Sequence, residues 1–65
     1  MLETKTIRAI LTQYPQTKAV FEAYGLYIYG QSETARHENL KASCLVNGIK
    51  LDAVVKALAE AVQGS

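Results

Sequence analysis

Cys44 and His37 are the residues of this chain that could ligate a metal. The 65-residue sequence has one cysteine and one histidine, and Glu38 directly follows the histidine. A structural zinc site needs four ligands, so a single chain cannot complete a cysteine and histidine set. Iron, haem or an iron–sulfur group could be carried by Cys44 and His37, with Tyr29 as a further ligand, and a dimer would double that ligand set.

Each of these residues also has a simpler interpretation. Cys44 lies four residues after Leu40, on the same face of a helix, so it could fill the core as a small hydrophobic side chain. His37 lies in a polar stretch, where an imidazole is usually exposed to solvent. A disulfide needs two sulfur atoms, so a chain with one cysteine has no thiol–disulfide couple of its own.

A second candidate site is the apolar, tyrosine-rich run after Gly25. Bulky apolar and tyrosine side chains alternate there, and alternating side chains cannot all face one core. Part of this surface should stay exposed or be covered by another chain, with local packing as the alternative. The predicted partner-binding residues are Leu26, Tyr27, Ile28, Tyr29 and Ser32.

Composition narrows the possible functions further. The net charge is +1, and no basic block or stripe is present, so nucleic acid is not expected as a partner. No apolar run reaches the length of a membrane span, and the first residues do not resemble a signal peptide. A single unpaired thiol without an export signal predicts a cytoplasmic protein. No catalytic residues are predicted, because no nucleophile with a neighbouring base, phosphate loop or carboxylate pair can be identified.

The apolar periods predict a single all-α domain over residues 1–65. Four short helices are expected at about residues 7–13, 16–24, 40–47 and 51–63, with a long loop between the second and third. Thr6 and Asn39 are suitable N-caps, while Gly25 and Gly48 can end helices with a positive φ. The first five residues are expected to be extended or frayed. The apolar face of the fourth helix is formed by Leu51, Val54, Val55, Leu58 and Val62.

Several short motifs, taken in order, resemble a known bacterial family. These are Tyr14-Pro15, Tyr24-Gly25-Leu26, Glu38-Asn39-Leu40 and Asn47-Gly48-Ile49. The family is described as the redox-disulfide domain associated with hybrid-cluster proteins, and it is related to the N-terminal domain of di-iron iron–sulfur-cluster repair proteins. The resemblance covers about residues 6–58 and implies an all-helical domain whose loop after Gly25 carries Cys-x-x-Cys.

This sequence lacks that pair of cysteines. Aligned on Gly25, the two cysteine positions fall on Ile28 and Gln31. Aligned on Glu38 and Leu40, with one inserted residue allowed, they fall on Tyr29 and Ser32. The redox chemistry that the family implies therefore cannot be carried over. The expected function is a non-enzymatic interaction module that binds a protein partner, or itself as a homodimer, through residues 26–32. The alternative is a metal, haem or iron–sulfur carrier that uses Cys44 and His37.

Overall fold

Four α-helices and three short 3-10 helices make up the part of the chain that the computed structural model describes, residues 2–31 and 38–64. In order they are η1 (Leu2–Thr4), α1 (Ile7–Gln13), η2 (Pro15–Thr17), α2 (Lys18–Ala23), η3 (Tyr27–Gly30), α3 (Leu40–Val46) and α4 (Leu51–Gln63). These residues contain no strand, and the prediction of a small all-α domain with four helices is confirmed.

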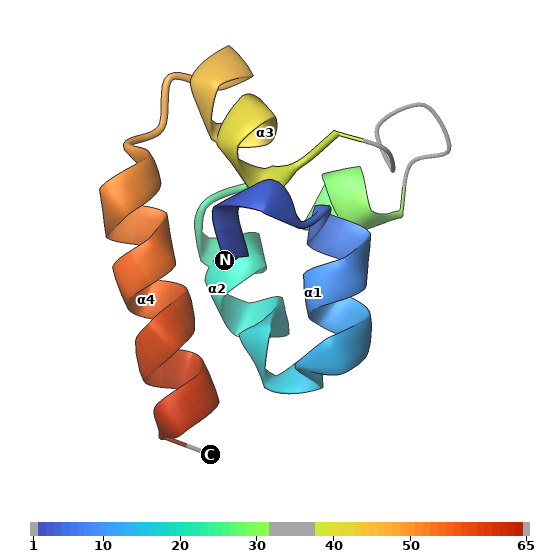
Figure 1. Ribbon diagram of the computed structural model, residues 1–65, viewed down its shortest axis with the longest axis vertical. Helices are drawn as coiled ribbons and strands as arrows, with labels where there is room; N and C mark the ends of the chain where they lie inside the picture. Colours follow the sequence, from blue (N-terminus) through green and yellow to red (C-terminus); the bar gives the residue numbers. More distant parts are fainter. Residues whose placement is uncertain (1, 32–37, 65) are drawn as a thin grey trace.

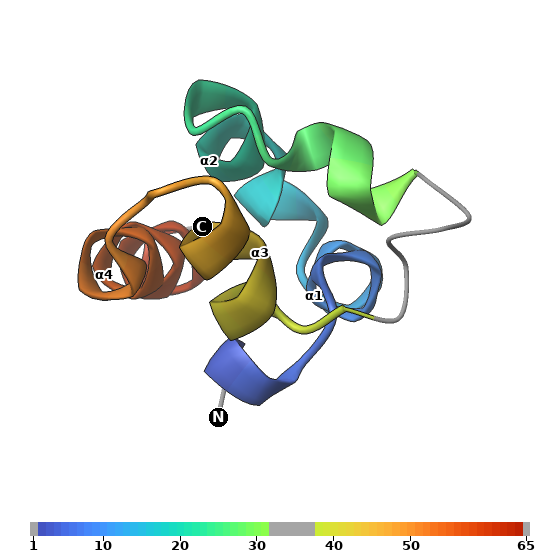
Figure 2. The same cartoon turned by 90° about the horizontal axis from the view of Figure 1, so that it is seen from above.

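The helices surround one core. Figure 1 shows α4 and α1 on opposite sides of the molecule, α2 between them, and α3 across the upper end. From above, α3 lies over the middle of the molecule, with α4, α2, η3 and α1 around it (Figure 2). Every α-helix contributes to the buried apolar cluster, whose members are Ile7, Ile10, Phe21, Leu26, Leu40, Cys44, Val54 and Leu58.

Two side-chain caps fix the starts of α1 and α3. The Thr6 hydroxyl oxygen accepts a hydrogen bond from the Ala9 N–H at 3.0 Å, and the Asn39 side-chain oxygen accepts one from the Ala42 N–H at 2.8 Å. The two cap residues also form an isolated antiparallel bridge with each other. Each cap satisfies a backbone donor that the helix leaves free, so the predicted cap residues do hold these helix ends.

Glycines with positive φ end α2 and α3 in the same way. Gly25 has φ +71° and Gly48 has φ +67°. After α2, the Leu26 N–H donates to the Phe21 carbonyl at 2.8 Å; after α3, the Ile49 N–H donates to the Cys44 carbonyl at 2.9 Å. In both turns the glycine N–H also bonds the carbonyl three residues back, so both are Schellman motifs.

The structure departs from the predicted elements at three short segments. Residues 2–4 form a 3-10 turn that packs against α3 and α4 rather than an extended or frayed end. Pro15 opens a 3-10 turn, so that α2 begins at Lys18 instead of residue 16. The loop after Gly25 contains η3, in which the Tyr29 N–H donates to the Leu26 carbonyl at 3.1 Å. Each segment is too short to show a period, so the sequence pattern does not reveal it.

Gly30 is a contact residue rather than a turn residue. Its φ is not positive, and it is buried against α1. A Cβ at this position would lie 2.6 Å from Leu11 Cδ1 and 3.3 Å from Ile7 Cγ2. The absence of a side chain therefore lets the end of η3 approach α1 closely.

Leu58 provides a direct test of the core. It is fully buried on α4, so Leu58→Ala should lower the free energy of unfolding by about 2–5 kcal/mol. Urea unfolding followed by circular dichroism measures this change. Lys56→Ala, at an exposed position of the same helix, is the control and should change stability by no more than about 0.5 kcal/mol. Equal losses in the two variants would contradict the assigned core face of α4.

Gly25 and Gly30 should respond differently to substitution. Gly25→Ala places a side chain at positive φ with no atom nearby, so the cost is backbone strain of about 1–2 kcal/mol. Gly25→Asn should recover part of that loss, because asparagine tolerates this conformation better. Gly30→Ala instead crowds Leu11 and should cost about 1–3 kcal/mol.

The variant Leu11→Ala tests whether steric crowding explains the cost of Gly30→Ala. In the Leu11→Ala background, Gly30→Ala should cost clearly less, because the crowded methyl group is gone. Thermal unfolding of the four variants in this cycle measures the coupling. Strictly additive costs would show that steric contact with α1 is not the reason for a glycine at residue 30.

Candidate partner-binding site

Leu26 opens the predicted binding segment, but its side chain lies in the core. It is fully buried and belongs to the same cluster as Phe21 and Leu58. The Schellman turn at Gly25 explains this position, because the residue after the glycine usually contacts the last helical turn. Leu26 is therefore removed from the predicted contact surface and assigned to the core.

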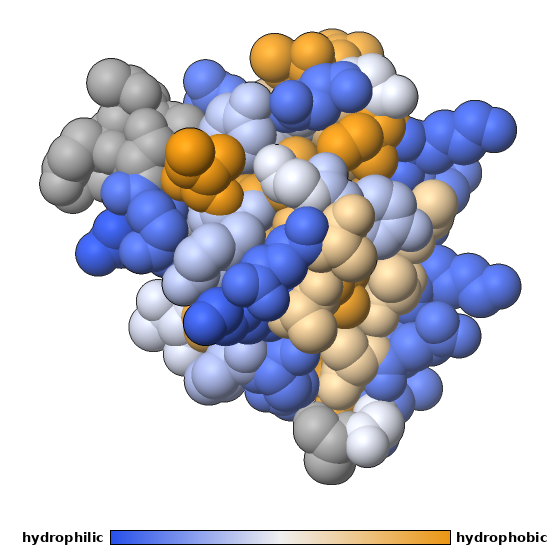
Figure 3. Space-filling model, turned by 180° about the vertical axis from the view of Figure 1, so that it is seen from behind, coloured by the Kyte–Doolittle hydropathy of each residue, from blue (hydrophilic) through white to orange (hydrophobic). Residues whose placement is uncertain are grey.

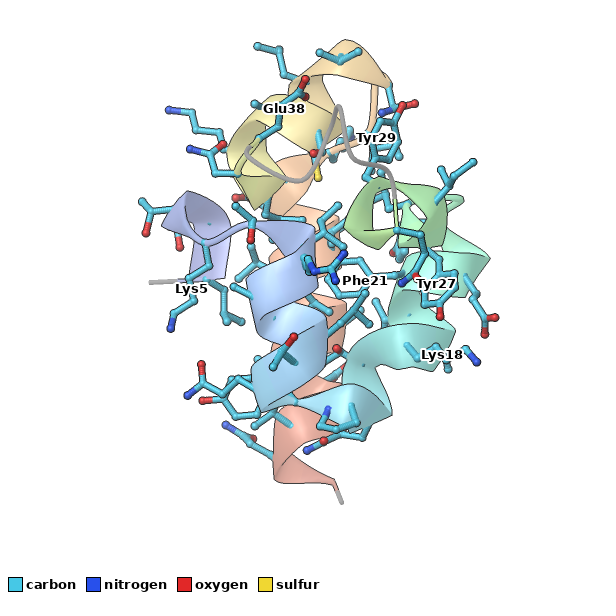
Figure 4. All side chains as sticks on the ribbon, turned by 90° about the vertical axis from the view of Figure 1, so that its right-hand side faces the viewer. Lys5, Lys18, Phe21, Tyr27, Tyr29 and Glu38 are labelled. Atoms are coloured by element: carbon cyan, nitrogen blue, oxygen red, sulfur yellow. The ribbon has the colours of Figure 1, made fainter. Side chains whose placement is uncertain are left out.

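Tyr27 and Tyr29 leave η3 in different directions (Figure 4). Tyr27 is half-buried, and the ammonium nitrogen of Lys18 on α2 lies 5.3 Å from the centre of its ring. This distance and placement define a cation–π contact. Tyr27 thus makes a local contact within the chain rather than extending freely into solvent.

Tyr29 instead joins η3 to the end of α3. Its hydroxyl group lies 3.0 Å from the side-chain nitrogen and 3.2 Å from the side-chain oxygen of Asn47. The Asn47 nitrogen also donates to the Ser43 carbonyl at 2.7 Å. Because Asn47 is the C-cap of α3, these bonds place η3 beside the C-terminal end of that helix.

Ile28 is the exposed member of the predicted segment. Its side chain is 66% exposed, although it lies between two half-buried tyrosines. The prediction that one side of this run would remain outside the core fits this position. Ser32, also predicted as a contact residue, lies outside the described residues.

Helix α3 buries small side chains and exposes larger apolar ones. Ser43 and Cys44 are buried, and the Ser43 hydroxyl donates to the Asn39 carbonyl at 3.2 Å. Leu45 and Val46 are 79% and 72% exposed. Burying leucine and valine is normally favourable, so this orientation leaves apolar area in water that the fold itself does not use.

We treat these exposed side chains as one surface region together with the hydrogen-bonded pair that joins their two elements, and none of the residues is of a charged type. We name it the α3–η3 patch, and its residues are Ile28, Tyr29, Leu45, Val46 and Asn47. From behind, strongly apolar atoms gather at the upper end of the molecule and, separately, on its flank, with hydrophilic atoms in blue and pale blue between the two groups (Figure 3). The Tyr29–Asn47 pair connects the two elements that carry the apolar side chains.

The residues of the alternative carrier site do not form a ligand set in the described structure. Cys44 is buried, and burial raises the pKa of its thiol above the ordinary value of 9.0. The thiol is therefore protonated at neutral pH, and the stability it contributes is lost only as the pH rises above 9.0. His37 lies outside the described residues. Among those described, no three His, Cys, Asp or Glu side chains are grouped to hold a metal ion.

Leu45 and Val46 were not predicted as site residues. The run Leu40–Val46 is apolar on more than one face, so its pattern does not say which side faces the core. The available signal was the number of apolar residues: a seven-residue helix across one end of a small domain cannot bury all of them. The sequence therefore indicates that some apolar residues of α3 stay exposed, but it does not indicate which ones.

Comparison with family models, curated proteins and solved structures gives no match to this chain. The resemblance to the redox-disulfide family therefore stays a prediction. Over the described ranges, no helix is both long and apolar enough to cross a bilayer, and no pocket is found.

The burial of Cys44 predicts a protected thiol. A maleimide should modify the native chain at least about 100-fold more slowly than the urea-unfolded chain, since reaction requires an opening that costs a few kcal/mol. Mass spectrometry of timed samples gives both rates. A native chain that reacts as fast as the unfolded one would show an accessible sulfur and would favour the carrier alternative.

Proposed function

We propose that this chain is a non-enzymatic protein-interaction module whose contact surface is the α3–η3 patch. The observation that supports the proposal is the orientation of α3, which buries Ser43 and Cys44 and exposes Leu45 and Val46. Large aliphatic side chains that are held in water by an ordered helix are typical of surfaces covered by another protein.

The patch has a fixed shape before any partner binds. The hydrogen bonds between Tyr29 and Asn47 hold η3 against α3, and Gly30 holds the end of η3 against α1. A preformed surface loses little conformational entropy on binding, which favours affinity. Tyrosine at its centre also agrees with the residue types that contribute most to protein interfaces.

The proposal keeps the predicted function but moves its site. The predicted segment contributes Ile28 and Tyr29, whereas Leu26 belongs to the core and Tyr27 contacts Lys18. The carrier alternative would require the buried thiol of Cys44 to leave the core. In this proposal the chain is a relative of the redox-disulfide family without its cysteine pair, in the reducing cytoplasm to which an unpaired thiol is suited.

The test is partner binding by matched double variants. Leu45→Ser with Val46→Ser removes the exposed aliphatic groups of α3; Ala53→Ser with Lys56→Ser makes two changes at exposed positions of α4 as the control. A protein captured by the wild-type chain is purified, and its affinity for each chain is measured by calorimetry. We expect the patch variant to bind at least tenfold more weakly and the control to bind like the wild type.

Circular dichroism must first show that both variants are folded. A captured partner that binds the folded patch variant as tightly as the wild type would contradict the proposed surface. Weaker binding by the α4 control alone would place the contact on α4 instead.

A further inference from the structure

Asn47 is followed directly by Gly48 at the C-terminal end of α3. Asparagine is a thermally labile residue, and it is most labile before glycine, which has no side chain to shield its backbone nitrogen. We infer that Asn47 is a deamidation site whose reaction the fold holds back, and that opening of the contact between η3 and α3 releases it. The reaction needs no partner, so it stands apart from the proposed function.

The reaction uses only Asn47, Gly48 and water. The Gly48 backbone nitrogen gives its proton to a solvent base and attacks the side-chain carbonyl carbon of Asn47. A carbon–nitrogen bond forms, the bond from that carbon to the Asn47 side-chain nitrogen breaks, and this nitrogen takes a proton from solvent and leaves as ammonia. Water then opens the resulting cyclic imide at one of its two carbonyl groups, which gives aspartate or isoaspartate. Both residues are exposed, so solvent reaches them without unfolding of the core.

Hydrogen bonds hold the Asn47 side chain away from this reaction. Its nitrogen donates to the Ser43 carbonyl at 2.7 Å and to the Tyr29 hydroxyl oxygen at 3.0 Å. The Tyr29 hydroxyl lies 3.2 Å from the Asn47 side-chain oxygen. The side chain must give up these bonds before its carbonyl carbon can turn toward the Gly48 nitrogen.

The backbone turn also holds the attacking nitrogen in place. The Gly48 N–H donates to the Leu45 carbonyl at 3.2 Å, and the Ile49 N–H donates to the Cys44 carbonyl at 2.9 Å. Asn47 has ψ 3°, so the Gly48 nitrogen is eclipsed with the Asn47 nitrogen rather than with the Asn47 Cβ. Ring closure needs this nitrogen beside Cβ. Asn47 must therefore rotate about ψ and break the turn.

The contact with η3 controls how often this opening occurs. Tyr29 bonds the Asn47 side chain from another element, whereas the Ser43 carbonyl belongs to α3 itself. The last turn of a helix frays easily when nothing outside the helix holds it. Such a local opening costs less free energy than unfolding of the whole domain, so it should set the rate in the folded chain.

Deamidation weakens the contact whose opening permits it. A carboxylate at residue 47 has no N–H, so it cannot donate to the Ser43 carbonyl. Its negative charge lies at the C-terminal end of α3, where the helix dipole disfavours it. Isoaspartate also adds a methylene group to the backbone at the turn. Both products should therefore leave η3 less firmly attached to α3.

Peptide mapping by mass spectrometry during incubation at mildly alkaline pH tests the reaction in the full chain. In urea, Asn47 should deamidate, while Asn39, which precedes the bulkier Leu40, should stay largely intact. The folded wild-type chain should react at Asn47 at least about tenfold more slowly than the urea-unfolded chain. Tyr29→Phe should raise the rate in the folded chain about two- to tenfold, the effect of losing one hydrogen bond, and leave the rate in urea unchanged.

Ile10→Val is the control for unfolding of the whole domain. It removes a buried methyl group from α1, at a cost in stability similar to that of one hydrogen bond, and it changes neither η3 nor α3. If the opening is local, this variant should deamidate at the wild-type rate. Amide hydrogen exchange of the wild-type chain measures the same opening without a variant, and the Gly48 amide should exchange faster than the Leu58 amide in the core helix.

Any of four results would overturn the inference. Asn47 that stays intact in urea is not a deamidation site, and a folded chain that reacts as fast as the unfolded one is not protected. A folded Tyr29→Phe chain with the wild-type rate would show that the contact with η3 does not control the reaction. Equal acceleration by Tyr29→Phe and Ile10→Val, or equal exchange protection of Gly48 and Leu58, would assign the reaction to global unfolding.

Discussion

The backbone turn at Gly25 determines where the following segment lies. Its positive φ allows the Leu26 N–H to reach the Phe21 carbonyl, and this bond directs Leu26 into the core beneath α2. After Leu26, η3 packs against α1, where a side chain at residue 30 would crowd Leu11. The exposure of Ile28 and the position of Tyr29 beside α3 both follow from this one conformation.

The second feature that shapes this structure is the face of α3 that packs against the core. The cap at Asn39 and the turn at Gly48 fix both ends of the helix, so its rotation is set by the backbone as well as by the apolar side chains. The small volumes of Ser43 and Cys44 allow α3 to lie close over the core, whereas leucine or valine there would force the helices apart. The burial of the small face of α3 thus explains both the close packing of this helix and the exposure of Leu45 and Val46.

Much of this fold could be predicted from the sequence, because its signals are local. Cap residues and regular apolar periods located all four helices, and α4 was the clearest since its face repeats over thirteen residues. The site was predicted less well. Ile28 and Tyr29 were found from an apolar run, but the burial of Leu26 depends on a turn and the exposure of Leu45 on helix rotation. Both depend on tertiary contacts that residue spacing does not describe.

The bridge between Thr6 and Asn39 has a consequence for how this domain can vary in length. Gly30 rests on α1, with its carbonyl 3.4 Å from an Arg8 guanidinium nitrogen, while the Leu40 N–H bonds the Lys5 carbonyl at 2.8 Å. Both ends of the segment between them are therefore anchored at the start of one helix. The entropic cost of closing a loop grows slowly with its length, by only about 0.6 kcal/mol for each doubling. Extra residues between the two anchor points, Gly30 and Leu40, should therefore lower the free energy of unfolding only slightly.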